Sequence, residues 1–408
     1  MENIKLKKLE NGITLITEKI SNIDTFSMGF FVKTGAINET KEESGISHFI
    51  EHLLFKGTKK RTAKEISEYV DFQGGSINAY TGRDVTCFYT KLISSKIDIA
   101  IDILTDMFLN STFEEENIEK ERNVIIEEIK MYDDIPEEVV HEKAIEFAIS
   151  GIHSNSISGT IENLKKIDRD MILKYLKERY IPQNIVIVAT GNIDEDYLYK
   201  ELASKMKAIE PKEDERVLDF SYKINSGKNI IKRDTAQVHL CFTTRGISNN
   251  SPMKYPVAII SNILAEGMSS RLFQKIREER GLAYSVYSYL TRFKNCGLLT
   301  VYAGTTEESY SEVIEIIKKE FEDIKNNGIL EKELQKAKNK YESAIVFGLE
   351  NSGSRMNRLA SSYLNFEKIH SIEDIKKEIN AVTLEDIKKA AAYVFDEEFY
   401  SCTIVGNI

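Results

Sequence analysis

Two histidines and a glutamate lie within five residues of one another, in the segment His48-Phe49-Ile50-Glu51-His52. On a helix, with about 100° between successive residues, His48, Glu51 and His52 project from one stripe. Two imidazoles four residues apart can share one Zn²⁺, while the carboxylate beside them serves a water molecule. The order H-x-x-E-H is a metallopeptidase signature. The alternative is a pair of surface histidines next to an incidental acid.

A catalytic zinc needs a third protein ligand, and a long acid-rich helix predicted over residues 114–133 offers several glutamates. The apolar side of this helix is set by isoleucines between Ile118 and Ile129. Glu128 and Glu121 both flank that side and lie two turns apart on one stripe. Periodicity therefore favours Glu128 as the third ligand. For most of the other glutamates, a solvated acidic face is the alternative.

The elements that must position these residues fall into two similar halves. Strand and helix signals in the first half recur in the same order roughly 206 to 212 residues later, which indicates an internal repeat. A charged, irregular stretch over 209–229 separates the halves, so we predict one domain over 1–215 and a second over 216–408. Because strands and helices are mixed in each half, the predicted class is α+β, with two homologous domains that each pack helices on a mainly antiparallel sheet.

Composition excludes several classes of protein. The 408 residues carry a net charge of −10, which argues against a nucleic-acid-binding protein. No run of apolar residues approaches the length of a membrane span, and the N-terminus lacks the layout of a signal peptide. The four cysteines are far apart and form no C-x-x-C pair. We therefore expect reduced cysteines, no partnership with nucleic acid or membrane, and a cytoplasmic location.

Three segments closely resemble the pitrilysin and insulinase superfamily of zinc metallopeptidases, nearest to its mitochondrial-processing-peptidase-like branch of two-domain chains. They are His48–Thr58, Gly75–Thr81 and Glu121–Glu128. The resemblance covers nearly the whole chain and implies a zinc endopeptidase with a pitrilysin-like fold. It also implies Glu128, 76 residues after His52, as the third zinc ligand.

In the mechanism that the resemblance implies, Glu51 takes a proton from water and later delivers it to the leaving amine. Glu121 either orients His52 or replaces a ligand transiently. Residues 76–81 are typical of an exposed edge strand, to which an extended peptide substrate can add by main-chain hydrogen bonds. The resemblance assigns those contacts to Asn78 and Ala79. The alternative is an ordinary sheet edge.

The second half lacks an H-x-x-E-H segment but carries Arg277 and Tyr284, seven residues apart. They resemble the arginine–tyrosine pair with which the family contacts the substrate carbonyl and stabilises the developing oxyanion. The competing choice for the arginine is Arg280. A surface arginine and a strand tyrosine without such a role are the alternative.

Members of the family enclose a chamber with four such domains, whereas this chain has two. The resemblance thus implies a homodimer in which Arg277 and Tyr284 of one chain serve the zinc of the other. One alternative is a non-catalytic structural or peptide-binding subunit. Another is the catalytic subunit of a heterodimer with an inactive sister chain.

Overall fold

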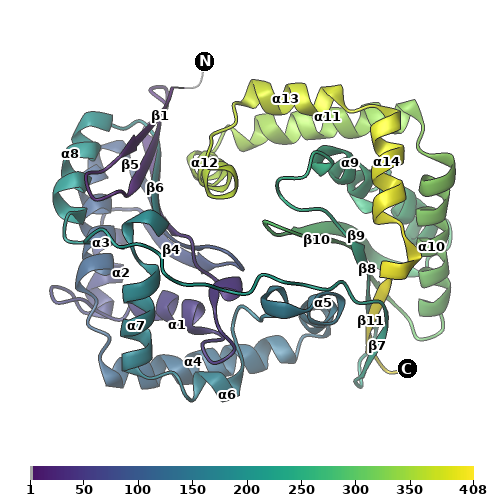
Figure 1. Cartoon of the computed structure of the whole chain (residues 1–408), viewed down its shortest axis with the longest axis horizontal. Coiled ribbons are helices and arrows are strands. Elements are labelled where there is room, and N and C mark those ends of the chain that lie inside the picture. Colours follow the sequence, from purple (N-terminus) through teal and green to yellow (C-terminus); the bar gives the residue numbers. More distant parts are fainter. Residues whose placement is uncertain (1–2) are drawn as a thin grey trace. The chain divides into compact units, whose positions relative to one another are not determined.

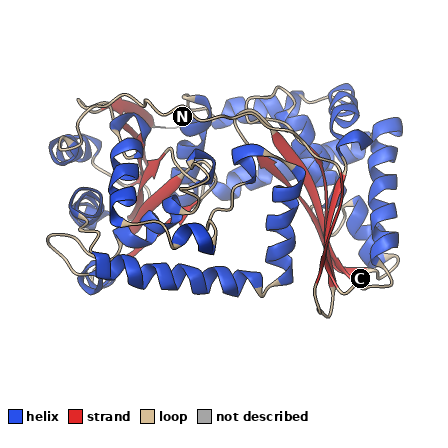
Figure 2. Cartoon of the chain, turned by 60° about the horizontal axis from the view of Figure 1, so that its bottom comes forward, coloured by secondary structure: helices blue, strands red, loops and turns tan. Residues whose placement is uncertain are grey.

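The structure is a computed structural model that describes residues 3–408. Runs of strands and runs of helices follow one another along the chain (Figure 1), and Figure 2 distinguishes the two by colour. The strands are β1 (Ile4–Lys8), β2 (Thr14–Lys19), β3 (Thr25–Val32), β4 (Ser76–Thr81), β5 (Thr86–Ile93), β6 (Ile185–Gly191), β7 (Gly227–Lys232), β8 (Val238–Arg245), β9 (Ala283–Arg292), β10 (Gly297–Thr305) and β11 (Ser401–Gly406).

The α-helices lie between these strands. They are α1 (Ile46–Leu54), α2 (Ala63–Asp71), α3 (Ile97–Asn110), α4 (Glu115–Asp133), α5 (Pro136–Ala148), α6 (Ile161–Leu164), α7 (Arg169–Arg179), α8 (Glu195–Met206), α9 (Lys254–Ala265), α10 (Tyr310–Asn327), α11 (Glu331–Gly348), α12 (Ser352–Phe366), α13 (Ile372–Ala381) and α14 (Leu384–Val394). A π-helical segment, η5 (Phe273–Glu278), precedes β9.

Two compact units make up the structure, and each contains one helix from the other half of the sequence. Unit 1 contains the residues up to Ile129, Asn155–Asp219 and Phe347–Ile369; unit 2 contains Lys130–Ser154, Phe220–Val346 and His370–Ile408. Helix α5 thus belongs to unit 2, although it comes from the first half, and α12 belongs to unit 1. The division predicted between residues 215 and 216 separates two homologous halves of the sequence, whereas the two units are defined by contacts in space. The predicted division therefore stays a prediction.

The sheets of the two units have the same plan. Their strand orders are β1-β2-β6-β3-β5-β4 in unit 1 and β7-β11-β8-β10-β9 in unit 2. One neighbouring pair in each sheet is parallel, β2 with β6 and β7 with β11, and the other pairs are antiparallel. Helices pack on both sheets. The predicted fold class, α+β with two homologous, mainly antiparallel domains, is confirmed.

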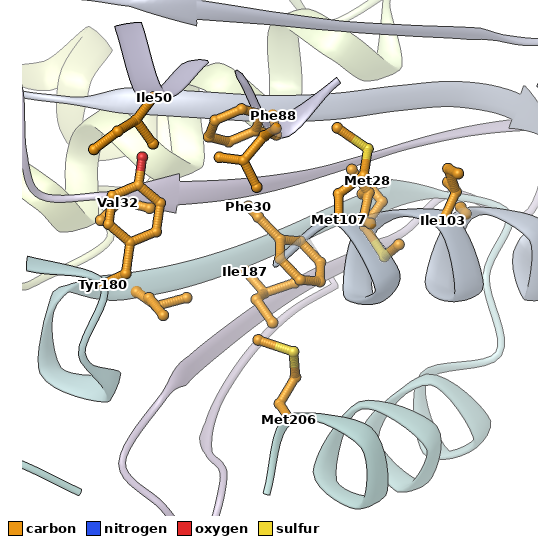
Figure 3. Packing of buried hydrophobic residues seen from close by; sticks show 14 of the residues in the cluster. Met28, Phe30, Val32, Ile50, Phe88, Ile103, Met107, Tyr180, Ile187 and Met206 are labelled. Atoms are coloured by element: carbon orange, nitrogen blue, oxygen red, sulfur yellow. The ribbon is translucent and has the colours of Figure 1, made fainter. Parts of the chain in front are cut away.

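The central strands β3 and β6 of unit 1 are buried on both faces, so their side chains do not alternate between buried and exposed. Met28 and Phe30 point into the main core with side chains of α1 and α3 (Figure 3). Phe31 points to the opposite face, where it packs with α12. Gly29 lets that helix approach, because a Cβ added there would lie 2.9 Å from Met356 Sδ.

In unit 2, α5 covers one face of the sheet. Its buried side chains Val139 and Val140 pack with Tyr302 of β10. The imidazole of His141 on α5 lies 2.8 Å from the hydroxyl groups of both Tyr287 and Tyr289. Helix α5 is therefore held on the sheet by apolar packing and by the contacts of one half-buried histidine.

Two further expectations concern the whole chain. Within residues 3–408, no helix has both the length and the apolar character that crossing a membrane requires. The four cysteines, all in the described part of the chain, are buried and free, as their spacing predicts.

Candidate metal centre

Helix α1 presents two stripes of different character. The side chains of one stripe are buried in the core of unit 1: Ile46, Phe49, Ile50 and Leu53. The other stripe carries the polar residues of the motif: His48, Glu51 and His52. The pattern that predicted this helix thus both anchors it in the core and fixes which side chains it leaves for chemistry.

Three of the predicted residues meet in one place in unit 1. His48, His52 and Glu128 each offer one ligand atom, and these atoms all lie within 4.8 Å of one another. Glu128 Oε2 is 3.9 Å from Nε2 of His48 and 3.6 Å from Nε2 of His52. Glu127, the neighbouring acid on α4, is exposed instead. The orientation of α4 therefore brings Glu128, rather than Glu127, close to the two histidines, while its role as a metal ligand stays a prediction.

This donor set suits Zn²⁺. Two imidazoles and one carboxylate are a set typical of catalytic zinc sites, which keep a fourth position open. Ligand atoms around a tetrahedral zinc lie about 3.4 Å apart, because the bonds are about 2.1 Å long. The measured separations of 3.6 and 3.9 Å between the carboxylate and the imidazoles are close to that value.

His48 is in the state that metal binding requires. It is buried, with 8% of its surface exposed, and burial together with the neighbouring His52 lowers its pKa to about 4. The imidazole is therefore neutral at pH 7, so its closeness to Glu128 is not an ion pair. Nδ1 of His48 has no hydrogen-bond partner among residues 3–408, and packing against His52, ring to ring at 4.7 Å, holds this ring.

His52 is oriented by a carboxylate. Oε2 of Glu121 lies 3.2 Å from Nδ1 of His52, and its other oxygen lies 2.9 Å from Nζ of Lys56. Burial raises the pKa of Glu121, but the hydrogen bonds with His52 and Lys56 outweigh it, so the pKa lies below its ordinary value. An ionised carboxylate at Nδ1 favours the tautomer that leaves Nε2 free to bind a metal. This contact fits the orienting role predicted for Glu121, while a transient ligand exchange stays a prediction.

Glu51 lies beside the cluster without belonging to it. Its Oε2 accepts a hydrogen bond of 2.5 Å from the hydroxyl of Thr81, the last residue of β4. Burial raises the pKa of Glu51, and the Thr81 hydrogen bond acts in the opposite direction. A carboxylate with a raised pKa beside a metal site is suited to receive and return a proton.

We expect Thr81→Val to lower kcat about tenfold with little change in KM, because one hydrogen bond to the reacting carboxylate is lost. Zinc content should not change, since Thr81 contacts no member of the cluster. The control is Thr17→Val, which removes a hydroxyl group that donates to Glu195 at 2.6 Å elsewhere in unit 1. Equal kcat values for the two variants, measured on one peptide, would show that the Thr81 contact has no effect on catalysis.

The predicted substrate strand does lie at a sheet edge. β4 pairs only with β5 in the described sheet, and its residues are alternately exposed and half-buried. The side-chain oxygen of Asn78 accepts from the backbone N–H of Ala79 at 2.8 Å. The roles of Asn78 and Ala79 in holding a peptide stay predictions.

Arg277 and Tyr284 lie in unit 2, whereas the metal cluster lies in unit 1. The guanidinium of Arg277 stacks on the ring of Tyr284 at 4.6 Å, and 73% of Tyr284 is exposed. Arg280 turns elsewhere: it donates to the backbone oxygen of Lys275 and pairs with Glu312 at 3.7 Å. The geometry thus brings Arg277, rather than Arg280, together with the tyrosine.

Sequence reasoning missed two contacts of this site. Strand alternation could have indicated Thr81, because it places Ile77, Ala79 and Thr81 on one face of β4. The alternation does not show which carboxylate Thr81 contacts. Lys56 lies beyond the end of α1 at Leu54, so helical periodicity does not indicate its contact with Glu121.

Known proteins resemble this chain along nearly its whole length. Residues 14–160 match the insulinase family (peptidase family M16), and residues 166–341 match the peptidase M16 inactive domain. The chain is 36% identical to the uncharacterized zinc protease YmxG of Bacillus subtilis over 97% of both proteins. It is 31% identical to an uncharacterized zinc protease of Streptomyces coelicolor, over 99% of this chain and 90% of the relative.

Solved structures share the fold. A protease from Helicobacter pylori superposes with a TM-score of 0.91 at 18% identity, over 99% of this chain and all of that one. A peptidase M16 inactive domain from Pseudomonas fluorescens superposes with a TM-score of 0.92 at 16% identity, over 100% and 98% of the two chains.

Proposed function

Because the chain belongs to the insulinase family of zinc peptidases, peptidase family M16, we propose that it is a zinc-dependent endopeptidase. One observation carries the proposal: His48, His52 and Glu128 converge, and Glu51 lies beside them without joining the cluster. A purely structural metal site has no use for the additional carboxylate. We further propose that the chain belongs to the mitochondrial-processing-peptidase-like branch, whose chains have two domains.

Each residue of the site has a part in this reaction. Zn²⁺, when bound, supplies Lewis acidity that polarises the scissile carbonyl and makes a water molecule acidic enough to react near neutral pH. Glu51 takes the proton of that water and later passes it to the leaving amine. Glu121, held by Lys56, keeps the imidazole of His52 in its metal-binding orientation.

The substrate in this proposal is a peptide or an unfolded segment bound in extended form. The edge of β4 can pair with the main chain of such a segment, and main-chain pairing tolerates many sequences. The test incubates the zinc-loaded chain with a library of quenched fluorescent peptides and identifies the product ends by mass spectrometry. We expect cleavage at internal bonds; release of single terminal residues only would contradict an endopeptidase.

We also propose that two copies of the chain form the working enzyme, a closed chamber. In this homodimer, Arg277 and Tyr284 of one copy bind the substrate carbonyl at the metal centre of the other. The exposure of Tyr284 and its contact with Arg277 support the proposal, since a ligand that reaches the tyrosine ring also meets the guanidinium stacked on it.

Mixing two inactive variants tests this arrangement. Glu51→Gln lacks the proton acceptor and Tyr284→Phe lacks the tyrosine hydroxyl, yet a mixed dimer contains one site with both groups intact. After equimolar exchange of subunits, about half of the dimers are mixed, so we expect about a quarter of wild-type activity. Activity equal to the sum of the separate variants would show that each chain supplies its own pair, or that the chains do not associate.

A non-catalytic, peptide-binding subunit is the second candidate. The match of residues 166–341 to an inactive domain favours it. That match begins after the H-x-x-E-H segment and after Glu128, and residues 14–160, which match the insulinase family, contain His48, Glu51, His52 and Glu128. A chain that carries one zinc and leaves every library peptide intact would establish the second candidate. We place either form in the cytoplasm, which the free, buried cysteines support.

A further inference from the structure

The residue just before helix α1 has no side chain with which to cap the helix. Most helix N-termini are stabilised by a side chain at the residue just before the first turn. In α1 this residue is Gly45, with φ of 94°, a conformation that favours glycine. A Cβ at Gly45 would lie 2.8 Å from the backbone oxygen of Ser158 and 3.0 Å from Cα of Gly159. The close approach of the two chain segments therefore excludes any side chain at this position.

A buried carboxylate from outside the helix supplies the cap instead. One oxygen of Glu39 accepts from the backbone N–H of Gly45 at 2.7 Å, and the other accepts from that of Ser47 at 2.9 Å. Glu39 has no exposed surface. The backbone oxygen of Glu39 also accepts a hydrogen bond of 3.4 Å from the side-chain amide of Asn155. This bond helps to hold the loop that contains Glu39. Both carboxylate oxygens of Glu39 thus accept hydrogen bonds from the N-terminus of α1.

The surroundings of this cap are polar and satisfied. The hydroxyl of Ser47 lies 2.9 Å from that of Tyr175, which lies 2.7 Å from the hydroxyl of Thr34. Burial raises the pKa of Glu39 to about 7, and the N–H groups of Ser47 and Gly45 act in the opposite direction. The fold therefore keeps this carboxylate in place although its complete burial costs free energy.

The location of the cap connects it to the metal centre. His48 follows Ser47 directly and lies in the first turn of α1, where a helix without its cap frays first. Glu51 and His52 lie one turn further on, and the whole helix has only nine residues. Nδ1 of His48 has no hydrogen-bond partner within residues 3–408, so the position of its ring depends on the position of its backbone and on the packing against His52.

We infer that Glu39 is a positioning residue for the metal centre: its carboxylate fixes the first turn of α1 and thereby holds His48 in register with His52 and Glu128. The carboxylate of Glu39 binds backbone N–H groups of Gly45 and Ser47 rather than the side chains of the cluster. The inference rests on the proposed function, because it assumes that these three side chains bind zinc.

The test replaces Glu39 by glutamine, whose size is similar but whose amide group can accept only one of the two N–H bonds. The zinc dissociation constant is measured by competition with a chromophoric chelator, and kcat and KM are measured at saturating zinc. We expect Glu39→Gln to bind zinc at least about tenfold more weakly and to have a lower kcat at nearly unchanged KM.

The matched control is Asp194→Ala, which removes the cap of α8 in the same unit, a 3.0 Å bond from the N–H of Tyr197. It should lower the melting temperature without changing zinc affinity. If Glu39→Gln does not fold, Glu39→Asp, which keeps the charge on a shorter chain, is measured in its place. Zinc affinity and kcat equal to those of the control would overturn the inference, whereas failure of the wild type to bind zinc would overturn the proposed function.

Discussion

His52→Ala should lose both zinc and activity. Of the three clustered residues, His52 has the most contacts at the site: Nε2 lies 3.6 Å from Glu128, and Nδ1 lies 3.2 Å from Glu121. Alanine removes one of the three proposed ligands and leaves the Glu121 carboxylate without that partner. We expect less than about a tenth of an equivalent of zinc per chain after dialysis and peptide hydrolysis at background.

The control for this variant is His239→Ala. His239 is a half-buried histidine of β8 that contacts the hydroxyl of Tyr302 at 2.9 Å, so its loss disturbs a comparable amount of structure in unit 2. It should retain one zinc per chain. Should His52→Ala keep a full equivalent of zinc, measured by inductively coupled plasma mass spectrometry, the metal lies elsewhere.

Glu51→Gln should abolish peptide hydrolysis and leave zinc binding unchanged. The amide keeps the size of the side chain but cannot take a proton, so we expect kcat/KM to fall at least about 1,000-fold. Because Glu51 is not one of the clustered residues, the variant should keep one zinc per chain. Measuring zinc and hydrolysis on the same preparation shows both effects together.

Glu127→Gln provides the matched control, since Glu127 is an exposed acid adjacent to Glu128 on α4. It should retain wild-type kcat/KM and zinc content. That result would show that loss of a nearby negative charge does not by itself lower kcat/KM. If Glu51→Gln retained more than about a tenth of wild-type activity, another group would have to transfer the proton.

Much of the site could be predicted because it depends on helical periodicity. A repeat of 3.6 residues per turn is the same in any surroundings, so it places His48, Glu51 and His52 on one stripe of α1 and Glu128 on the inner side of α4. Local patterns of apolar and turn residues predicted some strands as well, among them the edge strand over residues 76–81.

The remaining features depend on contacts between residues far apart in the sequence. Helices α5 and α12 each pack on the sheet of the other half, where they cover an apolar face. No local sequence pattern indicates which sheet a helix will cover. The Glu39 cap follows from the approach of Gly45 to Gly159, more than a hundred residues away. An acid in a polar loop is more often exposed, so its burial could not be predicted from composition.

The most direct test of the zinc-peptidase assignment is a zinc titration of the metal-free chain. The chain is stripped with a chelator, zinc is returned in steps, and hydrolysis of one quenched fluorescent peptide is recorded at each step. The proposed function predicts no activity without metal and a linear rise that ends at one zinc per chain. A chain that binds its full equivalent of zinc and still leaves the cleavable peptides of the library intact would contradict it.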